Sequence, residues 1–271
     1  MLHAEKTKQQ TIKDFGEQWT AYTENDGHYG SPQMFADIVE PLVSPPDFSG
    51  KTVAEIGSGA GRIVSMLIDA GANHVFAIEP SKAIEVLRAN TKKYGEKVQC
   101  LEITGDQIPS GLNLDFVLSI GVIHHIPDPA PVIEACFNAL RPGGKLLIWL
   151  YGREGNRLYL AVILPMRYIT KYLPDKLLSL FVYFIHMPLT TYIKLCRRFN
   201  LPMRGYMLNV IGKLSPDKQR LVIFDQLNPA YAKYYSELEA VSLLRDHGFD
   251  KVEVHRRHGY SHTVVGTKPR G

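Results

Sequence analysis

The residues best suited to chemistry are glycines and carboxylates that follow three apolar runs in the first half of the chain. The first set is E-I-G-S-G-A-G, Glu55 to Gly61. Glycines in such a turn let a ligand approach the backbone, and the N–H groups of a following helix point at whatever is bound. Glu79 ends the next run, where a carboxylate can accept hydrogen bonds from both hydroxyls of a ribose. Asp106 follows the third run, where it can meet the exocyclic amine of an adenine.

The turn could serve a dinucleotide or another ligand that contains adenosine. Its spacing is G-x-G-x-G, whereas dinucleotide folds use G-x-G-x-x-G, and Glu55 stands two residues ahead of the first glycine, where it would repel a pyrophosphate. A carboxylate beside the turn suits a ligand with an ammonium group and no phosphate. S-adenosylmethionine has adenine, ribose and an α-ammonium without phosphate, so we expect it as the cofactor.

These residues need a parallel sheet to bring them together. From Lys51 onward, short apolar runs alternate with amphipathic stretches, which is typical of parallel strands joined by crossover helices. The expected strands are K-T-V-A-E-I, H-V-F-A-I, V-Q-C-L-E-I, L-D-F-V-L-S-I and K-L-L-I-W-L, followed after an interruption by K-V-E-V-H-R and S-H-T-V-V-G-T. The glycine turn, Glu79 and Asp106 then all lie at the carboxyl edge of one sheet.

Over residues 51–150 the chain resembles class I S-adenosylmethionine-dependent methyltransferases of the broad small-molecule type. V-A-E-I-G-S-G-A-G matches the first motif of that family, A-I-E-P-S the acidic second, T-G-D-Q-I-P the third, and L-R-P-G-G-K-L-L-I the start of the fifth strand. The resemblance implies an α/β fold with a doubly wound, seven-stranded, mostly parallel sheet of the Rossmann-like methyltransferase type, whose last strand is antiparallel. A helical cap insertion completes the expected architecture.

The resemblance also assigns the cofactor site. Glu55 and the turn glycines line the methionine part, Glu79 holds the ribose, and Asp106 with the two residues after it brackets the adenine. The full expected set is Glu55, Gly57, Ser58, Gly59, Gly61, Glu79, Pro80, Ser81, Asp106, Gln107, Ile108, Ile120 and Trp19. Competing interpretations are a solvated strand end for Glu79, a simple turn former for Asp106 and a buried, turn-stabilising carboxylate for Glu55.

Two histidines are the candidate catalytic residues. His124 and His125 lie in G-V-I-H-H-I-P-D-P, directly after the fourth strand. Either could accept a proton or orient a nucleophile. The I-H-H-I stretch is frequent in this family even where no base is needed, and methyl transfer from a sulfonium can gain most of its rate from positioning of the acceptor. A mechanism without a base therefore stays open.

Absent motifs narrow the acceptor. Neither N-P-P-Y nor D-P-P-Y follows the fourth strand, and Cys100, Cys136 and Cys196 do not lie where a pyrimidine C5 nucleophile is expected. Methylation of nucleobase amines or of cytosine C5 is therefore disfavoured. No cluster of histidines or carboxylates has metal-ligand spacing, so we expect no metal.

The acceptor pocket should come from segments outside the sheet. Phe15, Trp19 and Tyr22 recur at spacings of four and three, on one face of a helix that is either core or a lid over the cofactor. A dense polar and aromatic set, F-D-Q-L-N-P-A-Y-A-K-Y-Y, precedes the sixth strand. The expected acceptor contacts are Tyr22, Tyr151, Asp225, Asn228, Tyr231 and Tyr235.

The expected organisation is an N-terminal helical lid over 1–50, a methyltransferase core over 51–151 and 221–271, and a basic, apolar helical insertion over 152–220 that caps it. Residues 153–220 hold twelve Lys or Arg against three Asp or Glu, a net charge of +9 in a chain whose total is +4. Four prolines, Pro165, Pro174, Pro188 and Pro202, predict several short helices there. The charge fits a solvated rim, a surface for an anionic or lipid-like acceptor or a membrane, or contact with RNA phosphate, in that order.

Length and composition agree with one large domain: 271 residues, of which 45% are hydrophobic and 21% charged. The first ten residues are too polar for a signal peptide, and the uncharged run 177–193 is interrupted by His186 and Pro188, so we expect no transmembrane helix. Three separated cysteines indicate a reducing compartment. We expect a cytoplasmic protein, with a position peripheral to the membrane left open.

The resulting hypothesis is methyl transfer from S-adenosylmethionine to a small or lipid-like acceptor, at oxygen rather than at nitrogen or carbon. The preference for oxygen is a base-rate argument. The alternatives are a tRNA-modifying enzyme of the wobble-uridine type, although nucleic acid is disfavoured as a partner, and a non-catalytic cofactor-binding subunit of a complex. The oligomeric state is left open.

Overall fold

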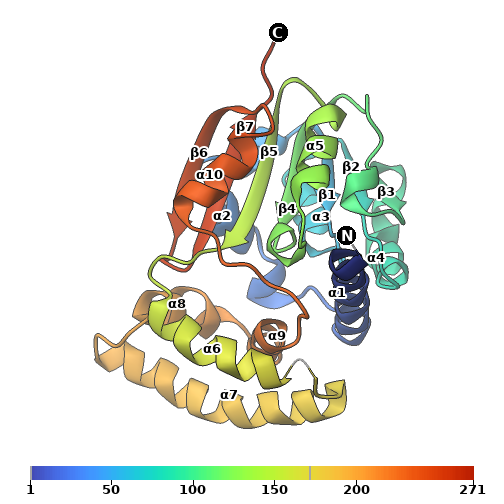
Figure 1. Ribbon diagram of the computed structural model, residues 1–271. Helices are drawn as coiled ribbons and strands as arrows, with labels where there is room; N and C mark the ends of the chain where they lie inside the picture. The colour runs from blue at the N-terminus through green and yellow to red at the C-terminus, as the bar shows by residue number, and fades with distance from the viewer. Residues whose placement is uncertain (1, 171) are drawn as a thin grey trace.

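The computed structural model describes residues 2–170 and 172–271, and within them seven strands form one sheet (Figure 1). The strand order is β3-β2-β1-β4-β5-β7-β6. The strands are β1 (Thr52–Ile56), β2 (His74–Ile78), β3 (Val98–Leu101), β4 (Leu114–Ile120), β5 (Leu140–Tyr151), β6 (Asp250–Arg257) and β7 (Ser261–Thr267). The first five pair in parallel, and β7 runs antiparallel to both β5 and β6. The predicted methyltransferase sheet with its antiparallel last strand is confirmed.

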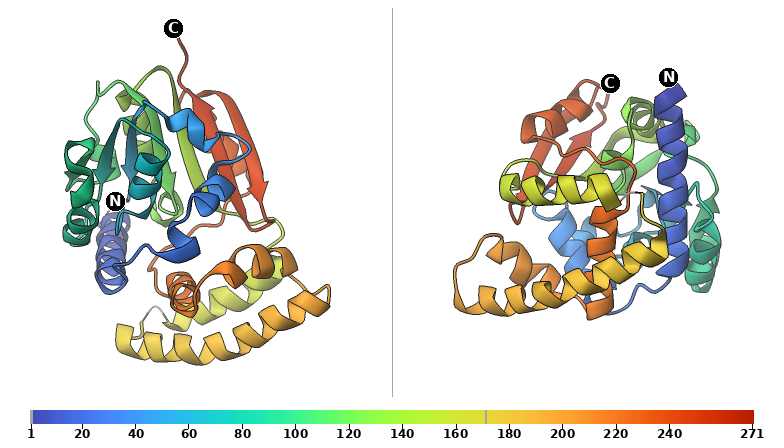
Figure 2. Two further views of the ribbon diagram at one scale, coloured as in Figure 1. Left: turned by 180° about the vertical axis from the view of Figure 1, so that it is seen from behind. Right: turned by 60° about the horizontal axis from the view of Figure 1, so that its bottom comes forward.

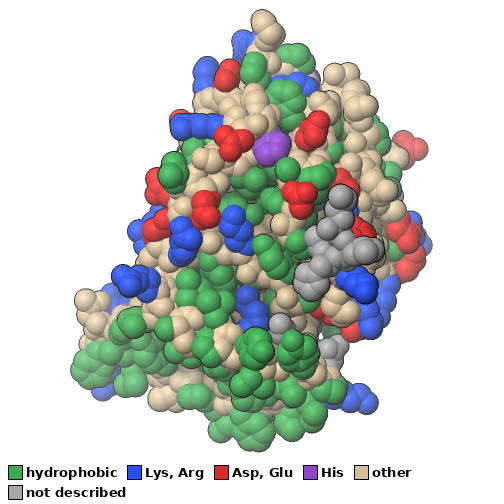
Figure 3. Space-filling model, in the orientation of Figure 1, with side chains coloured by type: hydrophobic (Ala, Val, Ile, Leu, Met, Phe, Trp, Pro, Cys, Tyr) green, Lys and Arg blue, Asp and Glu red, His purple; other side chains and the backbone are tan. Residues whose placement is uncertain are grey.

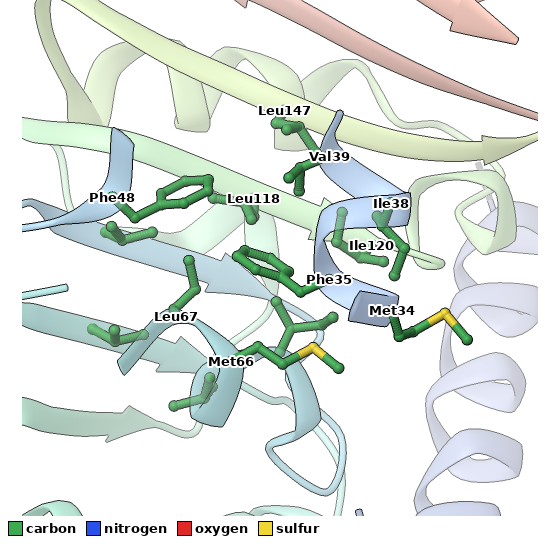
Figure 4. Packing of buried hydrophobic residues seen from close by; sticks show 14 of the residues in the cluster. Met34, Phe35, Ile38, Val39, Phe48, Met66, Leu67, Leu118, Ile120 and Leu147 are labelled. Atoms are coloured by element: carbon green, nitrogen blue, oxygen red, sulfur yellow. The ribbon is translucent and has the colours of Figure 1, made fainter. Parts of the chain in front are cut away.

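Helices cover both faces of the sheet because its strands are apolar on both sides. One face packs against α2 (Pro32–Val39), α3 (Arg62–Asp69) and α4 (Ile84–Thr91), the other against α5 (Ala130–Ala139) and α10 (Glu237–Arg245). The alternation of the strands is visible in β4, where Leu118 joins the first core and Val117 the second. Figure 4 shows the first core, with Phe35 of α2 beside Leu118.

The remaining helices lie at the carboxyl edge of the sheet or outside it (Figures 1 and 2). They are α1 (Leu2–Ala21), and in the cap α6 (Arg157–Thr170), α7 (Asp175–Arg198), α8 (Arg204–Asn209) and α9 (Pro216–Leu227). The cap has an apolar core of its own, made of Ile163, Leu178, Val182, Phe224 and Leu227. The segment 1–50 has two roles, because α1 lies at the sheet edge whereas α2 is part of the main core.

The prediction of short helices in the insertion was wrong for α6 and α7, which are 14 and 24 residues long. Pro165 lies inside α6 and Pro188 inside α7, and both are exposed. A proline removes one helical hydrogen bond and frees the carbonyl four residues before it. On an exposed face water can satisfy that carbonyl, so the helices continue. The last cap helix, α9, runs through residue 221, where the core was expected to resume.

Candidate functional site

The glycine turn connects β1 to α3 and is built for close approach. Gly57 and Gly59 have φ angles of +75° and +50°. A Cβ at Gly57 would lie 2.4 Å from Val122, and one at Gly59 would lie 3.0 Å from the indole nitrogen of Trp19. Only glycine fits both the backbone and the space, and the turn is therefore held tightly between the loop after β4 and helix α1.

Glu79 joins the turn to the end of β2, the neighbouring strand. Its Oε2 accepts a hydrogen bond from the N–H of Gly59 at 2.8 Å, and its Oε1 accepts from the N–H of Ser81 at 3.0 Å and from its hydroxyl at 2.5 Å. Burial raises the pKa of Glu79 against these hydrogen bonds. The carboxylate lines the main cavity, so it is not a solvated strand end.

Glu55 lies deeper than expected. Its side chain is buried and does not line the cavity, and among the described residues its Oε2 has no hydrogen-bond partner. Burial raises the pKa of Glu55 to about 8. An unpaired buried carboxyl oxygen carries a free-energy cost, and burial favours the neutral, protonated form of this side chain.

Asp106 follows β3, in the short 3-10 helix η4 (Gly105–Gln107) at the carboxyl edge of the sheet. It lines the cavity and pairs with Lys8 of α1 at 3.0 Å. Against partial burial, hydrogen bonds from Thr104 and Lys8 hold the pKa of Asp106 below its ordinary value. The next two residues have other roles: Gln107 caps its own turn by accepting from the N–H of Thr104 at 3.2 Å, and Ile108 packs in the second sheet core.

Helix α1 covers these groups. Gly16 packs against Ser81, and Trp19 packs over Gly59. The Phe15 ring lies 4.7 Å from the His125 ring, and Gln18 donates to Asp225 at 3.1 Å. Lys8, Gln18 and Phe15 were not predicted as site residues. The stripe 8, 11, 12, 15, 18 and 19, at helical spacing, was the signal that could have found them.

The structure separates the two candidate histidines, which lie in the 3-10 helix η5 (Ile123–His125). His124 is fully buried, does not line the cavity, and stacks on Tyr151 with 3.8 Å between ring centroids. His125 lines the cavity, and its Nδ1 lies 2.8 Å from the carbonyl oxygen of Tyr231, so Nδ1 carries the proton and donates. Burial lowers the pKa of His125 to about 4 and that of His124 well below its ordinary value. Of the two, only His125 is placed to face a ligand.

A network of hydrogen bonds between polar side chains lines the cavity beyond His125. The Tyr151 hydroxyl donates to Oδ2 of Asp225 at 2.7 Å, and the Gln226 amide donates to the Tyr151 oxygen at 2.7 Å. Tyr159 and Tyr234 both donate to Oε1 of Gln226. Burial, and then the negative charge of Asp225, raise the pKa of Tyr151 well above its ordinary value. This hydrogen-bond network thus joins the end of β5 to α6, α9 and the segment after α9.

Four of the expected acceptor contacts lie elsewhere. Tyr235 is buried in the second sheet core, and Tyr22 packs on Phe224 with 6.3 Å between ring centroids. Asn228 ends α9 as its C-cap, and the Tyr231 side chain does not line the cavity although its carbonyl holds His125. Tyr151 and Asp225 do line it. Tyr234, a member of the polar and aromatic set, lines it as well, and the aromatic residues of the wall that were not predicted include Tyr29, Trp149, Tyr159, Tyr206 and Tyr260.

One continuous cavity of about 270 Å³ connects both sets of residues. Gly57, Glu79 and Asp106 lie at its sheet end, and apolar and aromatic side chains of α6, α8 and α9 form its cap end. Some expected cofactor residues line it, namely Gly57, Glu79, Pro80, Asp106, Ile120 and Trp19. The others do not, namely Glu55, Ser58, Gly59, Gly61, Ser81, Gln107 and Ile108. In the described part of the chain no cluster of three or more histidine, cysteine or carboxylate side chains could hold a metal ion.

Known proteins resemble this chain in sequence and in fold. Residues 54–148 match the family described as "Methyltransferase domain". The ubiquinone biosynthesis O-methyltransferase of Dinoroseobacter shibae is 29% identical over 147 residues, which are 54% of this chain and 59% of that protein. The Aromatoleum aromaticum enzyme of the same name is 33% identical, over 46% and 54% of the two chains. The chain thus spans a little over half the length of these curated relatives.

Two solved structures from Burkholderia thailandensis share the fold over almost the whole chain. An O-methyltransferase family protein matches with a TM-score of 0.55 at 15% identity, covering 88% of this chain and 56% of that one. A 1,6-didemethyltoxoflavin-N1-methyltransferase, solved with bound 1,6-didemethyltoxoflavin and S-adenosylhomocysteine, matches with a TM-score of 0.52 at 14% identity, covering 89% of this chain and 79% of that one. At such identities the likeness concerns the fold, and it includes segments outside residues 54–148.

Proposed function

Residues 54–148 form a class I S-adenosylmethionine-dependent methyltransferase domain, and from this premise we propose that the chain transfers a methyl group from S-adenosylmethionine to an oxygen atom of a small, apolar or lipid-like acceptor. The observation that carries the proposal is the single cavity that runs from the glycine turn to the aromatic wall under the cap. A methyl donor and an apolar acceptor can therefore meet inside one enclosure, away from water.

The residues at the sheet end fit the cofactor. Gly57 lines the cavity, and the turn stays tight because Gly57 and Gly59 lack the Cβ that would meet Val122 and Trp19. Glu55 lies behind this turn and supports it from the buried side. We assign the ribose hydroxyls to Glu79, and the adenine amine to Asp106 once it releases Lys8. When bound, S-adenosylmethionine supplies an electrophilic methyl group on a sulfonium.

The chain's own residues position the acceptor and manage its proton. The aromatic wall binds the apolar part, and the Tyr151–Asp225 pair gives a hydroxyl group a fixed hydrogen-bond partner. Because Nδ1 of His125 donates to the Tyr231 carbonyl, its Nε2 is left as the acceptor for a hydroxyl proton. With a pKa of about 4 this histidine is neutral at pH 7 but a weak base, so we assign most of the rate to positioning.

The oxygen preference is supported by the names of the curated relatives, which are O-methyltransferases at 29–33% identity. The tRNA alternative needs a basic path into the cavity, whereas the cap side of the cavity is apolar and aromatic. A non-catalytic subunit would not need an enclosed acceptor wall. A cytoplasmic location stays a prediction.

The test is turnover with a graded set of acceptors. The protein is incubated with labelled S-adenosylmethionine and phenols or catechols that carry progressively longer alkyl tails, and methyl ethers are identified by mass spectrometry. We expect kcat/KM to rise with tail length, and Glu79→Ala to weaken cofactor binding in calorimetry by roughly tenfold or more because it loses charge-assisted hydrogen bonds. Label that enters tRNA and no phenol would contradict the proposal.

A further inference from the structure

The outer side of the cap carries an exposed apolar surface. Of fifteen large hydrophobic side chains that are exposed in the described residues, fourteen lie between 158 and 199. We call this set the cap face: Leu158, Val162, Leu164, Tyr168, Ile169, Tyr172, Leu177, Leu180, Phe181, Tyr183, Phe184, Met187, Leu195 and Phe199. Figure 3 shows the continuous apolar area that these helices form at the lower end of the molecule. Soluble monomers rarely expose contiguous apolar patches of this kind, which mark interaction sites.

Helix α7 has a buried apolar face toward the protein and a second, exposed apolar face. Its buried residues, such as Leu178, Val182 and Ile193, recur at helical spacing and face the rest of the protein. Leu180, Phe184 and Met187 form the opposite stripe and are 54%, 61% and 60% exposed. The helix is therefore apolar on both faces, and only one of them is covered by this chain.

Charge surrounds the cap face but is absent from its centre. Residues 177–193 contain no Asp, Glu, Lys or Arg. Lys176 lies at one end of this run, and Lys194, Arg197 and Arg198 lie at the other. These four basic side chains are exposed, and none has an acidic partner within ion-pair distance among the described residues. An apolar centre with a basic rim complements a surface of anionic headgroups above acyl chains.

The orientation of α7 follows from its contacts. The stretch Lys176–Arg198 is long and apolar enough to cross a membrane, but length and composition alone are weak evidence. His186 hydrogen-bonds to Gln219 of α9 at 2.8 Å, and Leu178 and Val182 share the cap core with Phe224. Crossing the bilayer would break this polar pair and expose that core. Lying flat leaves both intact and buries only the outer stripe.

We propose that the cap face docks on an anionic lipid bilayer, with α6 and α7 lying in the plane of the interface. A second copy of the chain is the competing occupant, but two copies would bring their basic rims together. The bilayer is favoured because it satisfies the apolar centre and the basic rim at once.

The same helices form the wall of the cavity, which links docking to the acceptor. Tyr159 of α6 and Leu221 of α9 line the cavity, whereas Leu158 and Val162 of α6 point to the cap face. The cap helices lie together below the sheet (Figure 1), with cavity-lining residues on one side of them and the cap face on the other. This step rests on the proposed function: the acceptor is an amphiphile drawn from the membrane, and in the cavity its apolar part lies against the aromatic wall with its hydroxyl group near His125.

The experiment measures vesicle binding without cofactor or acceptor, so that its result does not depend on catalysis. Phosphatidylcholine vesicles are compared with vesicles that contain about 30% phosphatidylglycerol, by flotation. We expect the protein to bind the anionic vesicles, and the triple variant Leu180→Ser/Phe184→Ser/Met187→Ser to bind them at least about tenfold more weakly. The matched control is Leu238→Ser, because Leu238 is 74% exposed but lies on α10, away from the cap face. The control should bind like the wild type.

The rim is tested by charge reversal. Lys194→Glu/Arg197→Glu should remove the preference for anionic vesicles, by roughly fivefold or more per charge, and salt at about 0.5 M should weaken wild-type binding similarly. Arg245→Glu, an exposed position on α10, is the control for net charge and should change binding little.

Equal vesicle binding by the wild type and the triple variant would overturn the docking proposal, and so would the absence of vesicle binding by the wild type. A concentration-dependent dimer that the triple variant abolishes in light scattering would then assign the cap face to a second copy of the chain. Calorimetry with S-adenosylmethionine separates this outcome from the proposed function. Intact cofactor binding and turnover of a soluble phenol without vesicle binding would end the docking proposal alone. Vesicle binding with no methyl transfer to any acceptor would end the proposed function alone.

Discussion

The two ends of the cavity are built in different ways. At the sheet end, the glycine turn, Glu79 and Asp106 follow consecutive parallel strands. Backbone groups hold the side chains there, as the N–H of Gly59 holds the Glu79 carboxylate. At the cap end, the Tyr151–Asp225 pair joins residues 74 positions apart and the Gln18–Asp225 bond joins residues 207 positions apart. The first end depends on local turns and the second on the packing of distant segments, so substitutions at the two ends should have separable effects.

Gly59→Asp should have the largest effect, a loss of cofactor affinity at the sheet end. The substitution places a side chain at φ +50°, against Trp19 and beside the Glu79 carboxylate. We expect cofactor affinity in calorimetry to fall by roughly a hundredfold or more, from backbone strain, steric overlap and charge repulsion. Gly95→Asp is the control, because Gly95 has φ +57° but no neighbour within 4 Å. Equal losses in both variants would show that general instability, and not the turn, is responsible.

His125 lies where the two ends meet, and its burial gives a pH dependence. Its pKa is about 4 in the folded protein and 6.5 ordinarily, so its contribution to stability is fully present above pH 6.5 and is lost as the pH falls toward 4. Between pH 7 and pH 5 this amounts to about 2 kcal/mol for His125. Urea unfolding should show a smaller loss over this range in His125→Gln. An identical pH dependence in the variant would contradict the assignment.

Asp225→Asn tests the cap end in the same way, through kcat/KM for the acceptor. It removes the charge that accepts the hydrogen bond of the Tyr151 hydroxyl while it keeps the size of the side chain. We expect kcat/KM for a phenolic acceptor to fall by about tenfold, the scale of one charge-assisted hydrogen bond, with cofactor affinity within about twofold of the wild type. A large loss of cofactor affinity would mean that the two ends are not independent.

Lys8→Ala should have the smallest effect on cofactor affinity. It tests the contact between helix α1 and the sheet end of the cavity. Lys8 holds Asp106 in an ion pair whose side chains are 27% and 28% exposed. Such pairs contribute little to stability, so the variant should fold normally. Since Asp106 no longer has to release a partner, we expect cofactor affinity in calorimetry to rise by up to about threefold. Weaker binding would assign Lys8 a direct role in holding the cofactor.

The fold was largely predictable, and the cavity-facing residues only in part. The glycine turn, Glu79 and Asp106 could be placed from the sequence because each directly follows an apolar strand and adjacent parallel strands end at one edge. Lys8 and Gln18 were missed because their helical spacing with Phe15 and Trp19 indicates a shared face of the helix but does not say what that face contacts. The continuous α6 and α7 were missed because local proline rules do not say that Pro165 and Pro188 lie on an exposed face.

The sequence by itself determined the succession of strands and the glycine turn, because these depend on apolar periodicity and on backbone conformations that favour glycine. The tertiary structure decided which neighbours face the cavity: His125 and not His124, Tyr234 and not Tyr235. Adjacent side chains differ only in direction, and packing between segments far apart in the chain sets that direction. The same packing left the outer stripe of α7 uncovered, which hydrophobicity alone could not distinguish from core.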